Sequence, residues 1–248
     1  YEVKRDAEGN ALAPVLADLH VFLGCDDAVG AEKTLTIPTG IAEIGFFLAN
    51  NKGACLPTQA DPLGATALSG QAPSFDGLAA LADAAPREPR LMVVSTLPYH
   101  GAGADAAQEL GFALATGVAY LRALEAAGLD VRTAAAKLGF RVAVGRDTFA
   151  ELAKLRALRV GWQKLLVAAG VTDAPPAHVH AVASPRTMSQ RDPWVNMLRV
   201  TTEVFAAILG GADLVTLEPF DAALAQPSAL GRRVARNTAL VLGQESFL

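Results

Sequence analysis

The feature that most constrains the fold is an alternation of short apolar runs with longer amphipathic segments between residues 91 and 217. Four runs have the length and composition of buried strands, namely Leu91–Leu97, Phe140–Val144, His178–Ala183 and Leu214–Leu217. They recur at intervals of roughly thirty to fifty residues, which is the spacing of βα units. Because parallel strands need crossovers of about a dozen residues or more, the pattern predicts four neighbouring parallel strands with their helices outside.

The segments between these runs predict helices whose ends are marked by capping residues. Aspartates begin three of them and glycines end them, over residues 105–128, 147–170 and 192–210. Pro193 suits the first position of the third helix. Five residues of that helix recur at spacings of three and four and predict a stripe facing a core: Trp194, Leu198, Thr201, Phe205 and Ile208.

The first ninety residues have a weaker pattern. Strand candidates there are Val15–Leu23, Leu35–Pro38 and Ala54–Pro57, while residues 71–74 and 85–90 resemble loops. The chain shows no close internal repeat and no low-complexity linker, so a single domain over residues 1–248 is predicted. A parallel βα array this regular forms either a closed barrel or a doubly wound sheet.

Composition excludes several classes of function. The 248 residues are 52% hydrophobic and 19% charged with a formal net charge of -4, which is typical of a globular domain. Because the chain has no dense stripe of Lys and Arg and no long apolar span or signal peptide, we expect neither nucleic-acid binding nor membrane association. Cys25 and Cys55 are too few for a disulfide framework, which favours a reducing, cytoplasmic location.

In either fold the loops that follow the strands carry the site, and here they cover residues 98–104, 145–146, 184–191 and 218–221. Ser184, Arg186 and Gln190 are the candidate substrate-binding residues on the third loop. The glycines of residues 101–104 lack the spacing of a phosphate-binding loop, so a tight turn is predicted there.

Four stretches carry a resemblance to a known family: "LPYHGAGADAAQELGFALATGVAYLRALEAAGLDV", "RDPWVNMLRVTTEVFAAILGGAD", "PFDAAL" and "RRVARNTALVLGQES". In this order they resemble consecutive blocks of the adenosylcobalamin-dependent methylmalonyl-CoA mutases, over about residues 91–248. The resemblance implies an α/β fold of the (β/α)8 TIM-barrel type, here expected to be truncated at the N-terminus. It also implies radical isomerisation of methylmalonyl-CoA and succinyl-CoA, with adenosylcobalamin as the cofactor of the holoenzyme.

The family has catalytic large subunits and related small subunits, and the sequence resembles the small ones more. Catalytic chains read T-Q-S-L-H-T-N where residues 212–218 read A-D-L-V-T-L-E, and Val182 replaces a polar residue. Several donors for an anionic thioester are therefore missing, and Asp213 and Glu218 are expected to repel the substrate carboxylate. The resemblance thus implies a heterodimer with a catalytic large subunit. The alternative is a catalytic acyl-CoA mutase barrel that uses a cobalamin domain on a separate chain.

The Tyr99-His100 pair is the candidate catalytic pair, because a Tyr-His pair in catalytic chains shields radicals and contacts the thioester carbonyl. Here the pair precedes "AGAD" two residues sooner than the catalytic "YHMQEAGA" pattern. The alternative is a packed pair that is hydrogen-bonded to backbone, which is common for His. Similarly, Ser189, Gln190 and Arg191 lie where a catalytic relative touches substrate, but here we expect them to cap and solvate the following helix.

Cofactor and metal sites are not predicted in this chain alone. Residues 18–24 resemble the D-x-H-x-x-G motif of cobalamin domains but have one residue too many before the glycine. His178 and His180 face the same side of a strand but lack a third ligand of matching spacing, so no metal site is expected. Arg232, Arg233 and Arg236 predict a solvated or partner-facing surface, with phosphate contact as the alternative.

Overall fold

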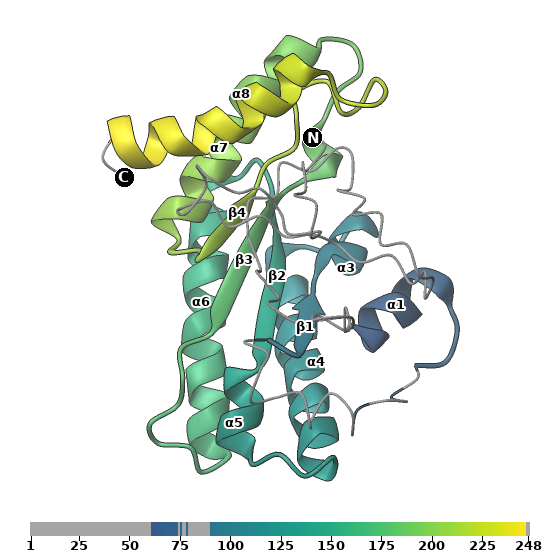
Figure 1. Ribbon diagram of the computed structural model, residues 1–248, viewed down its shortest axis with the longest axis vertical. Coiled ribbons are helices and arrows are strands. Elements are labelled where there is room, and N and C mark those ends of the chain that lie inside the picture. Colours follow the sequence, from purple (N-terminus) through teal and green to yellow (C-terminus); the bar gives the residue numbers. More distant parts are fainter. Residues whose placement is uncertain (1–60, 74, 76–77, 79–89, 247–248) are drawn as a thin grey trace, which may run out of the picture.

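The computed structural model describes residues 61–73, 75, 78 and 90–246 (Figure 1). Within these residues the chain forms a four-stranded, wholly parallel sheet in the order β1-β2-β3-β4. The strands are β1 (Met92–Ser95), β2 (Leu138–Val144), β3 (His178–Ala183) and β4 (Leu214–Thr216). The predicted α/β class and the predicted parallel neighbours are confirmed. The strand candidates before residue 60, and both cysteines, lie outside the described residues.

Helices connect the strands and cover one face of the sheet. They are α1 (Pro62–Ser69), α3 (Leu97–Gly101), α4 (Ala106–Ala126), α5 (Val131–Ala136), α6 (Thr148–Ala168), α7 (Pro193–Leu209) and α8 (Ala229–Leu240). A 3-10 turn, η1 (Pro185–Thr187), and a π-helical turn, η2 (Val241–Glu245), complete the elements. Figure 1 shows α4 and α6 running along the strands, with α8 lying across the end of the molecule beside α7. No described helix is both long enough and apolar enough to span a bilayer.

The predicted capping residues begin and end the helices as expected. Asp105 and Gln108 form a capping box at the start of α4, and Asp147 accepts a hydrogen bond from the amide of Ala150 at the start of α6. Positive φ angles at Gly128 and Gly170 follow these two helices, where a side chain would be strained. The helix boundaries were therefore readable from local chemistry.

The main core lies between the sheet and helices α4 and α6. Phe140 on β2 packs edge-on against Trp162 on α6, with ring centroids 4.9 Å apart. A Cβ atom at Gly117 on α4 would lie 2.7 Å from the Trp162 ring, so the close helix crossing requires glycine there. Gly161 on α6 approaches Leu114 in the same way, at 3.0 Å. The two glycines let large side chains from the opposite helix fill the layer.

The predicted apolar stripe of α7 is wrong. Trp194 and Leu198 are 59% and 69% exposed, and Trp194 stacks on Phe220 instead. The buried face is rotated from the predicted one and consists of Asn196, Val200, Glu203, Val204, Ala206 and Ala207. Val200 and Val204 pack in a second apolar cluster, while the polar groups of Asn196 and Glu203 bond to backbone. A hydrophobicity pattern assigns buried polar residues to solvent, and that is why it failed here.

Two further differences concern the segments around β1 and β2. The strand expected over residues 91–97 ends at Ser95, because Leu97 and Pro98 begin the short helix α3 where a loop was predicted. The predicted tight turn is limited to the residues after α3, where Gly103 has φ of 107°. Helix α5, ahead of β2, was not predicted.

Candidate functional site

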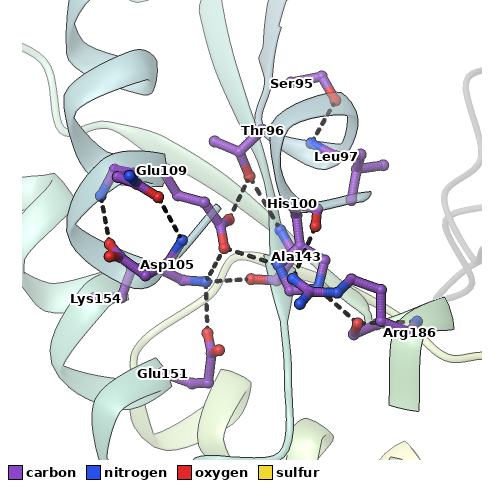
Figure 2. A network of polar contacts seen from close by, with 12 residues as sticks. Ser95, Thr96, Leu97, His100, Asp105, Glu109, Ala143, Glu151, Lys154 and Arg186 are labelled. Atoms are coloured by element: carbon purple, nitrogen blue, oxygen red, sulfur yellow. Dashed lines mark hydrogen bonds and ion pairs between the residues drawn. The ribbon is translucent and has the colours of Figure 1, made fainter. Parts of the chain in front are cut away.

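A buried polar network lies at the carboxyl ends of β1, β2 and β3 (Figure 2). His100 on α3 is at its centre, with Nδ1 2.8 Å from Glu109 Oε1 and Nε2 2.6 Å from Ser184 Oγ. The His100 side chain comes from the short helix after β1, Glu109 from the first turns of α4, and Ser184 from the residue after β3. Ser184 is 0% exposed and His100 is 7% exposed, so both lie inside the protein.

Glu109 connects this His to a buried ion cluster. Its Oε2 accepts a hydrogen bond of 2.9 Å from the Thr96 hydroxyl, and its Oε1 lies 3.2 Å from Lys154 Nζ. Burial alone would raise the pKa of Glu109, but the hydrogen bond from His100 and the charge on Lys154 outweigh it and hold that pKa below its ordinary value. Glu109 is therefore an ionised carboxylate inside the network.

Lys154 on α6 is almost fully buried and is compensated on three sides. Its ammonium lies 2.6 Å from Glu151 Oε2 and donates to the carbonyl oxygen of Ala143 at 2.8 Å, in addition to its contact with Glu109. A buried cation is tolerated only with such partners, because desolvating an unpaired charge costs several kcal/mol. The cluster thus joins α4, α6 and β2 by paired charges.

The loop after β3 is attached to the same network. The Ser184 amide donates to the carbonyl oxygen of Val144 at 2.9 Å and to Glu203 Oε2 at 3.1 Å. Arg186 Nη1 donates to the carbonyl oxygen of His100 at 2.8 Å, as Figure 2 shows. The loop is consequently held on α3 by a side-chain bond and a backbone bond.

Glu203 on α7 is a fully buried acid beside this loop. Its pKa is raised to about 8, chiefly by burial and also by the charges of Glu151 and Glu218, while hydrogen bonds from Thr187 and the Ser184 amide act in the opposite direction. The side chain is therefore protonated near neutral pH.

Asn196 on α7 fixes the position of the loop that precedes the helix. Its Oδ1 accepts from the Ser189 amide at 2.9 Å, and its Nδ2 donates to the carbonyl oxygens of Ser189 and Phe220, both at 2.9 Å. Gln190 Nε2 donates to the carbonyl oxygen of Ala223 at 2.9 Å, and the Arg191 amide donates to Ser189 Oγ at 3.3 Å. The residues before α7 tie two loops together, and Asp192 caps the helix as predicted.

The structure brings together three of the five residues predicted for the site. His100, Ser184 and Arg186 contact one another, whereas Gln190 is bonded to the loop after β4. Tyr99 packs against Phe112, with ring centroids 4.5 Å apart, and both lie at the molecular surface of this end. The roles of all five residues towards a substrate stay predictions.

The expected repulsion of a substrate carboxylate by Asp213 is wrong, because Asp213 lies at the other end of the strands. Its Oδ2 accepts from the Val179 amide at 2.7 Å and from Arg159 Nη2 at 2.9 Å, so it ties the start of β4 to the start of β3. Glu218 does follow the carboxyl end of β4, and burial raises its pKa to about 7 despite the charge of Arg141.

The two strand histidines lie on the face of the sheet that α4 and α6 do not cover. His180 is buried with Nε2 2.7 Å from Thr216 Oγ1, and burial together with the charge of Arg141 lowers its pKa to about 3. His178 is two residues earlier on the same face and is half-buried. Over the described part of the chain, no three His, Cys, Asp or Glu side chains are grouped as metal ligands would be.

Four buried members of the network were not predicted from the sequence: Glu109, Glu151, Lys154 and Glu203. A signal for two of them exists in α6, where Glu151 and Lys154 fall on the stripe of Leu155, Leu158 and Trp162. Charged residues on an otherwise apolar helix face predict a buried pair. On α8, Arg233 is exposed and Arg232 and Arg236 are half-buried, and the role of this arginine surface stays a prediction.

Comparison with known proteins identifies the family. The family model described as methylmalonyl-CoA mutase matches residues 76–248. The chain belongs to the methylmalonyl-CoA mutase family. The small subunit of the mutase from Streptomyces virginiae is 51% identical over 193 residues, covering 76% of this chain and 31% of that protein. A probable small subunit from Mycobacterium bovis is 43% identical over 196 residues, covering 76% of this chain and 32% of that protein.

A large subunit is also similar, but less so. The large subunit from Streptomyces virginiae is 40% identical over 162 residues, covering 64% of this chain and 22% of that protein. The chain therefore spans less than a third of the length of each of these relatives. The resemblance predicted from the sequence is confirmed at the level of the family, and the identities favour small subunits.

Proposed function

We propose that this protein is the barrel part of a methylmalonyl-CoA mutase small subunit, which supports a catalytic large subunit in a heterodimer. The observation that carries the proposal is the enclosure of His100. A histidine that acts on a substrate must place a ring nitrogen within hydrogen-bond reach of it. In this chain both ring nitrogens of His100 are bonded to buried side chains, at 2.8 and 2.6 Å.

The residues around His100 support a closed strand end. Ser184, the residue after β3, is fully buried, and one guanidinium nitrogen of Arg186 donates to the carbonyl oxygen of His100. Val182 is buried where catalytic relatives carry a polar side chain, and Glu218 adds an acid at the end of β4. These groups offer poor recognition of an anionic acyl-CoA, because such ligands need charge-assisted donors.

We further propose that the four described strands are part of a (β/α)8 barrel and that residues 1–248 belong to one such domain. Sequential parallel strands with helices on one face are the repeating unit of that fold. The face of the sheet opposite α4 and α6, with Arg141, His180 and Thr216, would then face the barrel interior.

Adenosylcobalamin is the cofactor we assign to the holoenzyme, but the described residues do not fit a role in binding it. His100 is bonded to Glu109 and Ser184, and His180 is bonded to Thr216 within the sheet. Residues 18–24, which resemble a cobalamin motif, lie outside the described residues. The acyl-CoA substrate is likewise assigned to the heterodimer, and a cytoplasmic location goes with that function.

The test is to purify the full-length chain alone and together with the large subunit from the same source. Light scattering coupled to size-exclusion chromatography measures complex formation, and succinyl-CoA formation measures activity with added adenosylcobalamin. We expect a one-to-one complex that is active, and no turnover by the chain alone. Turnover when the chain is combined only with a free cobalamin-binding domain would establish the alternative, a catalytic barrel.

A further inference from the structure

We propose that His100 is a positioning residue that carries its imidazole proton on Nδ1 and, as an acceptor for the Ser184 hydroxyl, fastens the loop after β3 to α3. We call the unit of Ser184, His100 and Glu109 the His100 latch. It is built from 2.6 Å and 2.8 Å contacts between three side chains, which lie on α3, on α4 and at the residue after β3. The latch is present whether or not the chain catalyses a reaction.

The assignment of the proton follows from counting donors and acceptors around the ring. Glu109 can only accept, because its carboxylate also receives bonds from Thr96 and Lys154, so the 2.8 Å contact requires a proton on Nδ1. Ser184 Oγ already accepts from the Arg186 amide at 3.2 Å. The remaining short contact of the Ser184 hydroxyl is with Nε2 of His100, at 2.6 Å, so the hydroxyl donates its proton to that nitrogen. With Nε2 as acceptor, each of these polar groups has a partner, as buried groups require.

Further contacts surround the latch. A Cβ atom at Gly145 would lie 3.9 Å from Cε1 of His100 and 3.2 Å from Glu151 Oε1, so the residue after β2 lies close to this part of the network. Arg186 adds a second attachment through the carbonyl oxygen of His100. Lys154 holds Glu109 in place from the opposite side, at 3.2 Å. The latch therefore makes α3 and the loop of residues 184–191 one rigid unit.

The connectivity of acid, imidazole and hydroxyl is also that of a hydrolase triad, but the backbone argues against acyl transfer. The Ser184 hydroxyl is fully buried, and the Ser184 amide is bonded to Val144 and Glu203, so it cannot form an oxyanion hole. A triad would need this hydroxyl to be reachable by a substrate. The latch instead uses the same bonds to hold two loops together.

The first measurement is nitrogen NMR of the imidazoles in the full-length chain, at about pH 8, where a free imidazole is neutral. We expect His100 to show a protonated Nδ1 and an unprotonated Nε2, and His100→Gln identifies its signals. Glu109→Gln should mix the two tautomers, because a side-chain amide can donate to the ring as well as accept from it. Ser184→Ala should keep the proton on Nδ1. A wild-type ring with its proton on Nε2 would overturn the proposal.

The second measurement is hydrogen exchange of the same protein and its variants. Ser184→Ala should speed the exchange of amides in residues 97–104 and 184–191 by roughly tenfold, because a buried acceptor loses its donor. Ser189→Ala is the matched control, since the Ser189 hydroxyl accepts only a local bond from the Arg191 amide. Equal exchange in the two variants would show that the hydroxyl of Ser184 does not fasten the loop. Covalent labelling of Ser184 in the wild type by a fluorophosphonate would contradict the latch and indicate a triad.

Discussion

The apolar layer between the sheet and helices α4 and α6 and the polar network at the strand ends are both buried, but they are held together differently. In the layer, burial and close packing stabilise Phe140, Trp162 and Leu158. The hydrophobic effect is non-directional, so these side chains need no specific partner atoms. In the network, Lys154 and Glu109 are stable only because each charge has a partner. Loss of one residue from the layer leaves a cavity, whereas loss of one from the network leaves an uncompensated charge.

The largest effect should follow removal of the buried cation. Lys154→Met leaves Glu109 and Glu151 facing each other without a cation and should lower the free energy of unfolding by roughly 3 to 5 kcal/mol. Urea denaturation of the full-length chain measures it. Lys164→Met, at an exposed position of the same helix, should change it by less than about 0.5 kcal/mol. A loss below about 1 kcal/mol at Lys154 would mean that the network contributes little to stability.

A slightly smaller effect is expected from the apolar layer. Leu158 is fully buried, so Leu158→Ala should lower the free energy of unfolding by roughly 2 to 4 kcal/mol through lost burial and a cavity. Val160→Ala on the exposed side of α6 is the control, with an expected change within about 0.5 kcal/mol. If Leu158→Ala were nearly neutral, the contrast between layer and network would have to be abandoned.

The third effect is a dependence of stability on pH that the layer lacks. The pKa of Glu203 is about 8 in the folded chain and near 4.5 when exposed, so the folded state holds a proton that the unfolded state releases between these values. Its contribution to stability is fully present below about pH 4.5 and is lost as pH rises towards 8, by up to about 1.4 kcal/mol per pH unit.

Glu203→Gln should therefore flatten the decline of unfolding free energy between about pH 6 and pH 8. Glu218, whose pKa is raised to about 7, contributes in the same direction in both proteins, so the difference between them reports Glu203 together with its interaction with Glu218. Denaturation curves of the two proteins at both pH values measure this difference. Parallel curves would show that Glu203 is ionised throughout this range.

The sequence predicted the apolar layer better than the network, for physical reasons. Buried parallel strands are continuous apolar runs, and β3 was predicted to the residue. β2 begins two residues earlier than predicted, at Leu138, because register with β3 includes Gly139 opposite His178. Such pairing depends on the neighbouring strand, so the local hydrophobicity pattern of the sequence does not predict where β2 begins.

The site was only partly predictable because its members come from helices as well as loops. Ser184 and Arg186 were predicted because loops after strand ends carry functional groups, and His100 because the Tyr99-His100 pair resembles that of catalytic mutase chains. Their partners Glu109 and Lys154 lie on helices, where charged side chains are normally assigned to solvent. The charged side chains on α4 and α6 can be recognised as a buried pair only in the tertiary structure, where the two helices pack against each other.

We propose that the network closes the strand ends, so that this chain supports catalysis without performing it. The most direct test is kcat of the purified complex with the large subunit, measured per assembled heterodimer, for wild type and for His100→Gln. We predict values that agree within about twofold, because His100 contacts Ser184 and Glu109 rather than substrate. A loss of about a hundredfold or more, as removal of an acid–base group typically causes, would contradict the claim.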